Sequence, residues 1–152
     1  MYIKRKLEEV IKTNLFQGKV VIVYGARQVG KTTLVRKIAQ DVTDSYSYLN
    51  CDELDVLSRL QSAETSEALR QIIGEQKLVV IDEAQRVKNI GLKLKLMNDT
   101  YPETQIIATG SSSFDLANEV NEPLTGRSFE FWLFPLRLDE LFDATKTIEA
   151  QR

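Results

Sequence analysis

Apolar residues in the first part of the chain change from a helical spacing to a strand-like run and back. In residues 2–15 they recur at intervals of three and four, which predicts an amphipathic helix. Gly18 follows, where the turn after a helix favours a residue that tolerates positive φ. Residues 19–24 form a mostly β-branched apolar run, typical of a strand buried on both faces of a parallel sheet. Helical spacing returns over residues 31–40.

The rest of the chain repeats this alternation of helices and strands. Further strands are predicted at residues 45–50, 78–81, 105–109 and 128–133. Helices are predicted at residues 53–74 with a break near Ser62 and an end at Gly74, around residues 92–101, in a short stretch before the fifth strand, and at residues 138–142. Apolar strands separated by helices indicate a parallel α/β sheet with helices on both faces. Ligands of such sheets bind at the carboxyl ends of the strands.

The composition narrows the class of protein. The chain has 152 residues, of which 43% are apolar and 28% charged, and this suits one globular domain. It contains no His, which excludes a Ser-His-Asp or Cys-His mechanism and the imidazole ligands of a zinc site. The lone Cys51 favours a small core residue in a reducing compartment over a redox site. The apolar runs fall short of the ~20 residues of a membrane-spanning helix and no signal peptide precedes them, so we expect a cytoplasmic protein with no membrane partner.

Charge is distributed unevenly along the chain, although the net charge is only −2. Residues 1–40 carry nine basic and two acidic residues, whereas residues 41–152 carry 11 and 20, so a protein that coats DNA is not expected. The basic segment at residues 4–6 (Lys4, Arg5 and Lys6) favours a solvated helix face, and a contact with nucleic acid or another partner is left open. We interpret the aromatic residues of the fifth strand region as core packing rather than base stacking: Phe129, Phe131, Trp132 and Phe134.

A phosphate-binding motif follows the first predicted strand. Residues 25–32 match G-x-x-x-x-G-K-[ST], the P-loop, between a strand and a helix as the motif requires. The glycines let backbone N–H groups face phosphates at the positive end of the next helix. Lys31 is expected to reach the β- and γ-phosphates of ATP, and the Thr32 hydroxyl to bind Mg²⁺. The expected nucleotide contacts are Gly25, Ala26, Arg27, Gln28, Val29, Gly30, Lys31, Thr32 and Thr33, although Arg27 and Gln28 equally fit a solvent-facing loop tip.

A second motif places two acids at the end of the third predicted strand. The run over residues 78–83 is apolar and ends in Asp82 and Glu83, which is the Walker B pattern. Asp82 is expected to hold Mg²⁺, and Glu83 to polarise the attacking water as a general base. An acidic pair at a strand end is on its own usually a solvated turn. The upstream P-loop favours the functional interpretation here.

Two further polar residues are candidates for the same chemistry. Ser111 follows the fourth strand and is preferred over Thr109 as the side chain that orients the water, although a helix cap before Leu116 fits it too. Arg127 precedes the fifth strand and offers a guanidinium for the charge of the transition state. A structural surface arginine is the alternative. The sequence leaves open whether Arg127 faces its own nucleotide or that of a neighbouring copy.

Four stretches together carry a family resemblance, at residues 25–34, 79–85, 109–112 and 124–127 leading into 133–136. They resemble the AAA-type P-loop ATPases and, within these, the prokaryotic AAA family fourteen. The resemblance implies a five-stranded sheet of order 5-1-4-3-2, ATP with Mg²⁺, a sensor role for Ser111 and an arginine-finger role for Arg127. It further implies that residues 1–152 are one ATP-binding domain (helix 1–18, P-loop core 19–135) from the N-terminal part of a longer protein, followed by a C-terminal partner domain.

These observations lead to one principal hypothesis and two rivals. The principal hypothesis is a domain that binds and hydrolyses ATP and couples the nucleotide state to a partner domain or subunit, including a further copy of itself. A slow nucleotide-dependent switch is the first rival. A small-molecule kinase is the second, and it is disfavoured because the pair Asp82 and Glu83 suits activation of water and no arginine-rich lid is recognisable. GTP is not expected because no Asn-Lys-x-Asp segment occurs.

Overall fold

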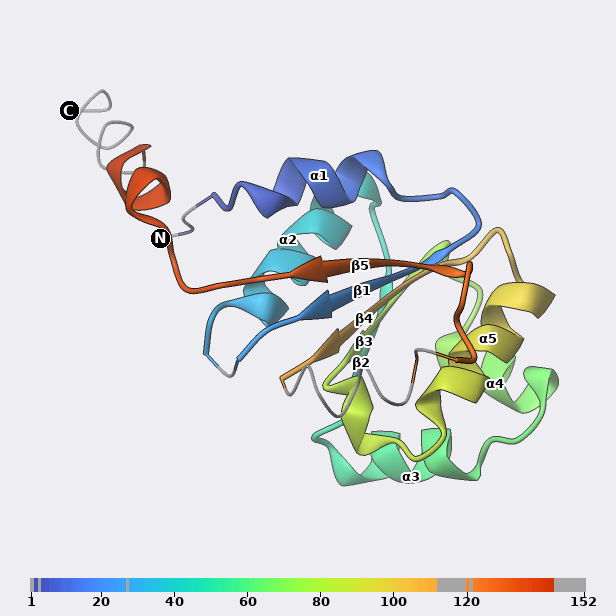
Figure 1. The fold of residues 1–152 in the computed structure, drawn as a ribbon. Helices are drawn as coiled ribbons and strands as arrows, with labels where there is room; N and C mark the ends of the chain where they lie inside the picture. The colour runs from blue at the N-terminus through green and yellow to red at the C-terminus, as the bar shows by residue number, and fades with distance from the viewer. Residues whose placement is uncertain (1, 3, 27, 112–119, 121, 144–152) are drawn as a thin grey trace.

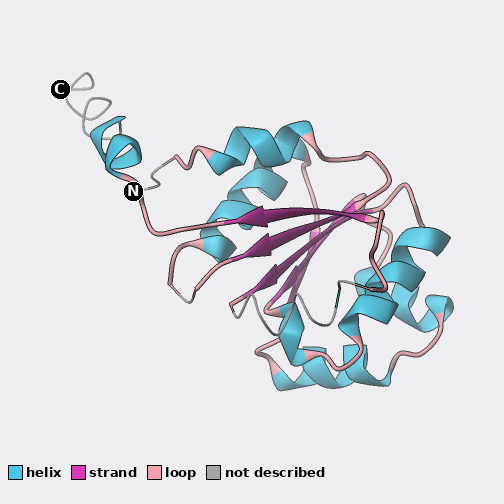
Figure 2. Ribbon diagram, viewed as in Figure 1, coloured by secondary structure: helices cyan, strands magenta, loops and turns pink. Residues whose placement is uncertain are grey.

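A central parallel sheet with helices on both faces forms the molecule, which is described by a computed structural model over residues 2, 4–26, 28–111, 120 and 122–143 (Figures 1 and 2). Its strands are β1 (Val20–Tyr24), β2 (Ser47–Asn50), β3 (Leu78–Asp82), β4 (Gln105–Gly110) and β5 (Ser128–Trp132). Its helices are α1 (Leu7–Thr13), α2 (Lys31–Val42), α3 (Leu54–Ser62), α4 (Ser66–Ile73), the 3-10 helix η1 (Ala84–Arg86) and α5 (Ile90–Thr100). Residues 138–143 are also helical.

The sheet has the strand order β2-β3-β4-β1-β5, and every neighbouring pair is parallel. Read from its other edge this is the order 5-1-4-3-2, so the predicted topology is confirmed. The register places Val23 of β1 beside Thr109 of β4, and Ile81 of β3 beside Ala108 of β4. The carboxyl ends of these three adjacent strands therefore meet at one edge of the sheet.

Side chains of β1 alternate between two apolar cores, one on each face of the sheet. Val21 and Val23 pack with residues of α1 and α2, while Val20, Ile22 and Tyr24 pack with residues of α3, α4 and α5. Figure 1 shows α1 and α2 on one side of the sheet and α3–α5 on the other. Helices cover both faces of the central strands β1, β3 and β4, so these strands are fully buried. Strands buried on both faces favour apolar residues at consecutive positions, which explains the apolar runs in the sequence.

Element boundaries follow the turn signals with some corrections. The helix predicted over residues 2–15 is shorter, from Leu7 to Thr13, although Gly18 does adopt a positive φ of 74°. The predicted break near Ser62 is confirmed: α4 begins after Thr65, whose side chain accepts a hydrogen bond from the Ala68 N–H, and it ends at Gly74. The short helix predicted before β5 falls mainly outside the described residues.

The aromatic residues around β5 correct one prediction. Phe129 and Phe131 are partly buried against the core, but Trp132 is 47% exposed and Phe134 is 66% exposed. Trp132 packs against the ring of Tyr24, with ring centroids 4.7 Å apart. It therefore lies on the outer strand β5 and not inside the core. Cys51 is buried as expected. No helix in the described ranges has the length and apolar character needed to cross a bilayer.

Candidate nucleotide site

The P-loop connects β1 to α2 at the sheet edge where the strands end, and its backbone geometry depends on two glycines. A Cβ atom on Gly25 would lie 2.6 Å from the carbonyl oxygen of Leu133, so only glycine fits there. Gly30 caps the N-terminus of α2 with a φ of 95°, in the left-handed region that favours glycine. Gln28 also has a positive φ, of 66°. Arg27 lies outside the described residues.

Lys31 is the first residue of α2 and lies inside the loop. Only 4% of its surface is exposed, and its Nζ donates a hydrogen bond to the carbonyl oxygen of Ala26 over 2.7 Å. The ammonium group is therefore held within the same loop whose amides are expected to face the phosphates.

Asp82 ends β3 and accepts hydrogen bonds from three hydroxyl groups. Its Oδ2 accepts from Thr32 Oγ1 over 2.7 Å and from the Tyr48 hydroxyl over 2.6 Å, and its Oδ1 accepts from Thr109 Oγ1. Asp82 is 3% exposed, so the carboxylate depends on these donors in place of water. Burial, followed by the hydrogen bond to Asp82, raises the pKa of Tyr48, which keeps its hydroxyl protonated as a donor.

Thr32 and Asp82 fit the protein's share of a magnesium site. Mg²⁺ in nucleotide sites is usually held by one or two protein oxygens together with phosphate oxygens and waters. A hydroxyl and a carboxylate 2.7 Å apart, one from the P-loop helix α2 and one from the end of β3, supply that kind of oxygen. Within the described ranges no group of three or more His, Cys, Asp or Glu side chains forms a cage of the all-protein type.

Glu83 follows Asp82 and is fixed by two contacts. Its backbone is in the left-handed conformation with a φ of 57°, and its N–H donates to Thr109 Oγ1 over 3.1 Å. Its carboxylate Oε2 accepts from Gln85 Nε2 over 2.7 Å, and the same Nε2 also contacts Ser111 Oγ at 2.9 Å. The two residues predicted to act on water, Glu83 and Ser111, are thus brought together through Gln85.

Arg127 is not brought to this cluster. It directly precedes β5, and its carbonyl oxygen accepts from the N–H of Val20 at the start of β1. The five residues of β1 span about 16 Å at ~3.3 Å per residue, and the P-loop lies beyond their far end. The guanidinium is paired with Asp99 of α5, with Nε 2.8 Å from Oδ1, at the amino edge of the sheet.

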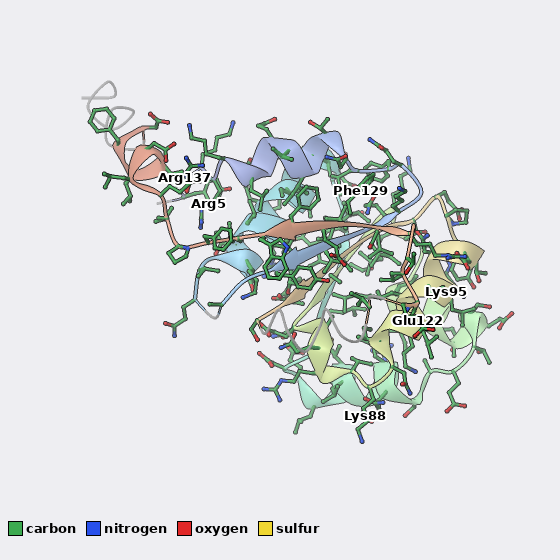
Figure 3. The ribbon with its side chains drawn as sticks, in the orientation of Figure 1. Arg5, Lys88, Lys95, Glu122, Phe129 and Arg137 are labelled. Atoms are coloured by element: carbon green, nitrogen blue, oxygen red, sulfur yellow. The ribbon has the colours of Figure 1, made fainter. Side chains whose placement is uncertain are left out.

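Arg5 corrects the interpretation of the basic N-terminal segment, because it is 7% exposed and not a solvated side chain. Its Nη1 donates to the carbonyl oxygen of Val29 in the P-loop over 2.7 Å, and its Nη2 donates to that of Phe134. Its Nε lies 3.3 Å from Oε2 of Glu140. Figure 3 shows Arg5 and Arg137 at the end of the molecule where the chain leaves β5.

Sequence reasoning missed several of these contacts. Tyr48 lies on the half-buried strand β2, where polar and apolar residues alternate as in many strands. Nothing in this pattern indicates a contact with Asp82. The sequence favours Ser111 over Thr109 as the polar residue of the site, yet both contribute. Thr109 contacts Asp82 and Glu83 directly, and Ser111 contacts Gln85. Gln85 lies two residues after Glu83 in the sequence. This short spacing is the only feature of the sequence that points to their contact.

Solved structures with a similar fold include a Walker-type ATPase and a nucleotide-analogue-bound DnaA. The Walker-type ATPase PABY2304 of Pyrococcus abyssi superimposes with a TM-score of 0.67 at 20% identity, over 91% of this chain and 55% of that one. The AMPPCP-bound DnaA from Aquifex aeolicus gives a TM-score of 0.58 at 16% identity, over 86% of this chain and 48% of that one. These likenesses establish a P-loop ATPase fold.

Relatives by sequence include two uncharacterised proteins of Methanocaldococcus jannaschii. MJ1544 is 30% identical over 133 residues, which are 86% of this chain and 30% of the relative. MJ1637 is 28% identical over 159 residues, which are 98% of this chain and 32% of the relative. The chain thus spans about a third of the length of these relatives. The profile of one AAA domain family, the fourteenth, matches residues 17–142, and the chain therefore belongs to this family of AAA domains.

Proposed function

We propose that this domain binds ATP with Mg²⁺ and hydrolyses it. The observation that carries the proposal is the hydrogen bond from Thr32 of the P-loop to Asp82, the residue directly before Glu83. A P-loop alone is compatible with binding only. The adjacent carboxylate of Glu83, which is not needed to hold the metal, supplies a base for water.

Each side chain has a distinct part in this proposal. The loop amides and Lys31 bind the phosphates, and Thr32 with Asp82 holds Mg²⁺. The metal ion when bound supplies charge neutralisation at the β- and γ-phosphates. Glu83 takes a proton from water as the water oxygen bonds to the γ-phosphorus and the bond to the β,γ-bridging oxygen breaks. The products are ADP and inorganic phosphate, and Ser111 is proposed to orient the water.

Binding is tested with a Lys31→Ala variant. Titration calorimetry with AMPPCP and Mg²⁺ should give heat of association for the wild type and none for the variant, because the ammonium group is lost from the phosphate site. Lys37→Ala is the matched control, since Lys37 lies on the same helix but pairs with Asp41 on the surface. Equal affinity of the wild type and the Lys31→Ala variant contradicts the proposed site.

Hydrolysis is tested with a Glu83→Gln variant. The amide cannot accept the proton, so release of phosphate from ATP should fall while AMPPCP binding is retained. General-base catalysis contributes about 10²–10⁴-fold, and a loss in that range is expected. Glu75→Gln, an exposed glutamate outside the site, is the control. Unchanged turnover in Glu83→Gln removes this residue from the mechanism.

The remote position of Arg127 favours a second candidate, a slow nucleotide-dependent switch. Arg127 is at the opposite sheet edge from its own P-loop, so a finger role requires the nucleotide of a neighbouring copy. ATPase activity per molecule should then rise with protein concentration, and Arg127→Ala should abolish the rise. Arg59→Ala, an exposed arginine of α3, is the control. A slow activity that is independent of concentration instead supports the switch.

We further propose that the nucleotide state is coupled to the segment after β5. The support is the Arg5 side chain, which joins the P-loop carbonyl of Val29 to Phe134 and Glu140. AMPPCP with Mg²⁺ should change hydrogen exchange of the amides in residues 133–143 in the wild type. It should change them less in Arg5→Met, with the exposed Lys4→Met as control. An identical response in both variants contradicts this coupling.

A further inference from the structure

The carboxamide of Gln85 lies between the proposed general base and the side chain proposed to orient water. Gln85 belongs to the short helix η1, which turns the chain back directly after β3. Its Nε2 is 2.7 Å from Glu83 Oε2 and 2.9 Å from Ser111 Oγ, so one amide group contacts residues at the ends of β3 and β4. The hydrogen bond from Gln85 thereby favours one orientation of the Glu83 carboxylate.

The other half of the same carboxamide makes no hydrogen bond within the described residues that would explain the position of the side chain. Gln85 Oε1 is buried and has no hydrogen-bond partner in the part of the chain that the structure describes. Within these residues the Gln85 side chain is therefore hydrogen-bonded through Nε2 alone, to Glu83 and Ser111.

We propose that Gln85 is a positioning residue for ATP hydrolysis, which orients the Glu83 carboxylate toward the attacking water by a hydrogen bond from its amide. This inference rests on the proposed hydrolytic function of Glu83. Gln85 does not hold nucleotide or metal in this scheme, because its contacts reach neither the P-loop nor Asp82. Its loss should slow the chemical step and leave binding intact.

The test compares Gln85→Met with wild type by steady-state ATPase kinetics and AMPPCP calorimetry. Methionine keeps the length of the side chain but removes the donor. A base displaced by about 1 Å can cost ~100-fold in rate, so we expect kcat to fall at least about tenfold with KM and AMPPCP affinity unchanged. Gln61→Met is the matched control, because the side-chain Oε1 of Gln61 accepts a hydrogen bond from the Lys88 N–H away from the site.

A double-mutant cycle with Glu83→Gln separates positioning from general damage. If Gln85 acts through Glu83, adding Gln85→Met to the Glu83→Gln variant should have no further effect on kcat. If Gln85→Met unfolds the protein, Gln85→Asn replaces it, since asparagine keeps the carboxamide but withdraws it by one methylene. The same loss of kcat with retained binding is expected.

Each remaining outcome overturns the proposal in a distinguishable way. Unchanged or faster turnover in both Gln85 variants shows that the amide does not assist Glu83. Equal effects of Gln85→Met in the wild-type and Glu83→Gln backgrounds show that it acts independently of Glu83. A wild type that binds AMPPCP but releases no phosphate from ATP overturns the proposed hydrolysis and, with it, the role of Gln85.

Discussion

The hydroxyl group of Thr109 is hydrogen-bonded to both acidic residues of the site. Replacing Thr109 with valine tests how much these hydrogen bonds contribute to stability. Its hydroxyl donates to Asp82 Oδ1 and accepts from the N–H of Glu83. Thr109 is fully buried at the end of β4, so water cannot replace the hydroxyl. Valine has nearly the same shape, and the substitution therefore removes the hydrogen bonds with little change in packing.

The expected loss of stability depends on the two groups that lose a hydrogen-bond partner, the Asp82 carboxylate and the Glu83 N–H. A hydrogen bond to a charged group contributes about 1.5–3 kcal/mol, and an unsatisfied buried donor costs about 1–3 kcal/mol. Asp82 keeps two other hydroxyl donors and the Glu83 N–H is only partly buried, so the two values do not add fully. We expect the free energy of unfolding of Thr109→Val to fall by about 2–3 kcal/mol.

Urea denaturation without nucleotide measures this loss. With a slope near 2 kcal/mol per molar urea, the midpoint should fall by about 1–1.5 M. Thr109→Ser is the control, because it keeps the hydroxyl and loses only a methyl group, at a cost of about 0.5–1.5 kcal/mol. A valine variant at least as stable as the serine variant would refute the argument that Thr109 is held there by its hydrogen bonds.

Three further predictions concern other parts of the molecule. Gly25→Ala should lower stability by about 1–3 kcal/mol in urea, because its Cβ would meet the Leu133 carbonyl at 2.6 Å. Burial raises the pKa of the Cys51 thiol to about 12, so a thiol reagent at pH 8 should label it only after denaturation. Burial raises the pKa of Glu140, but backbone amide donors and Arg5 outweigh it and hold the pKa below its usual value. Its contribution is then complete above the unfolded value of about 4.3 and is lost as pH falls through the folded value. The urea midpoints of wild type and Glu140→Gln should therefore differ at pH 7 and converge once the pH is below the folded pKa.

The sheet could be predicted from the sequence because its central strands are buried on both faces. Such strands are apolar along most of their length, and the apolar runs of β1, β3 and β4 reflect this, with polar residues only near their ends. The P-loop and the acidic pair were located by the same reasoning, since each follows a strand. Tyr48 was missed because β2 is an edge strand with half-buried positions, where an aromatic residue has no required partner.

Contacts that depend on register or on distant segments could not be read in this way. Whether the side chains at the end of β4 face the acids at all depends on the register of β4 beside β3, because a shift of one residue moves every side chain to the other face. The actual arrangement uses both: Thr109 bonds to the acids directly and Ser111 bonds through Gln85. Arg5 joins segments more than a hundred residues apart, which no local pattern encodes.

Arg127 shows where the rule of strand ends was applied incompletely. In a parallel sheet, residues that follow strands gather at one edge, and residues that precede strands gather at the other. Arg127 precedes β5, so the same rule that joins the P-loop to Asp82 places this arginine at the amino edge, beside Asp99. A nucleotide of the same domain lies out of its reach along the length of β1. An arginine-finger role for Arg127 therefore requires a second copy whose P-loop faces this edge, and the dependence of ATPase activity on protein concentration is the measurement that decides it.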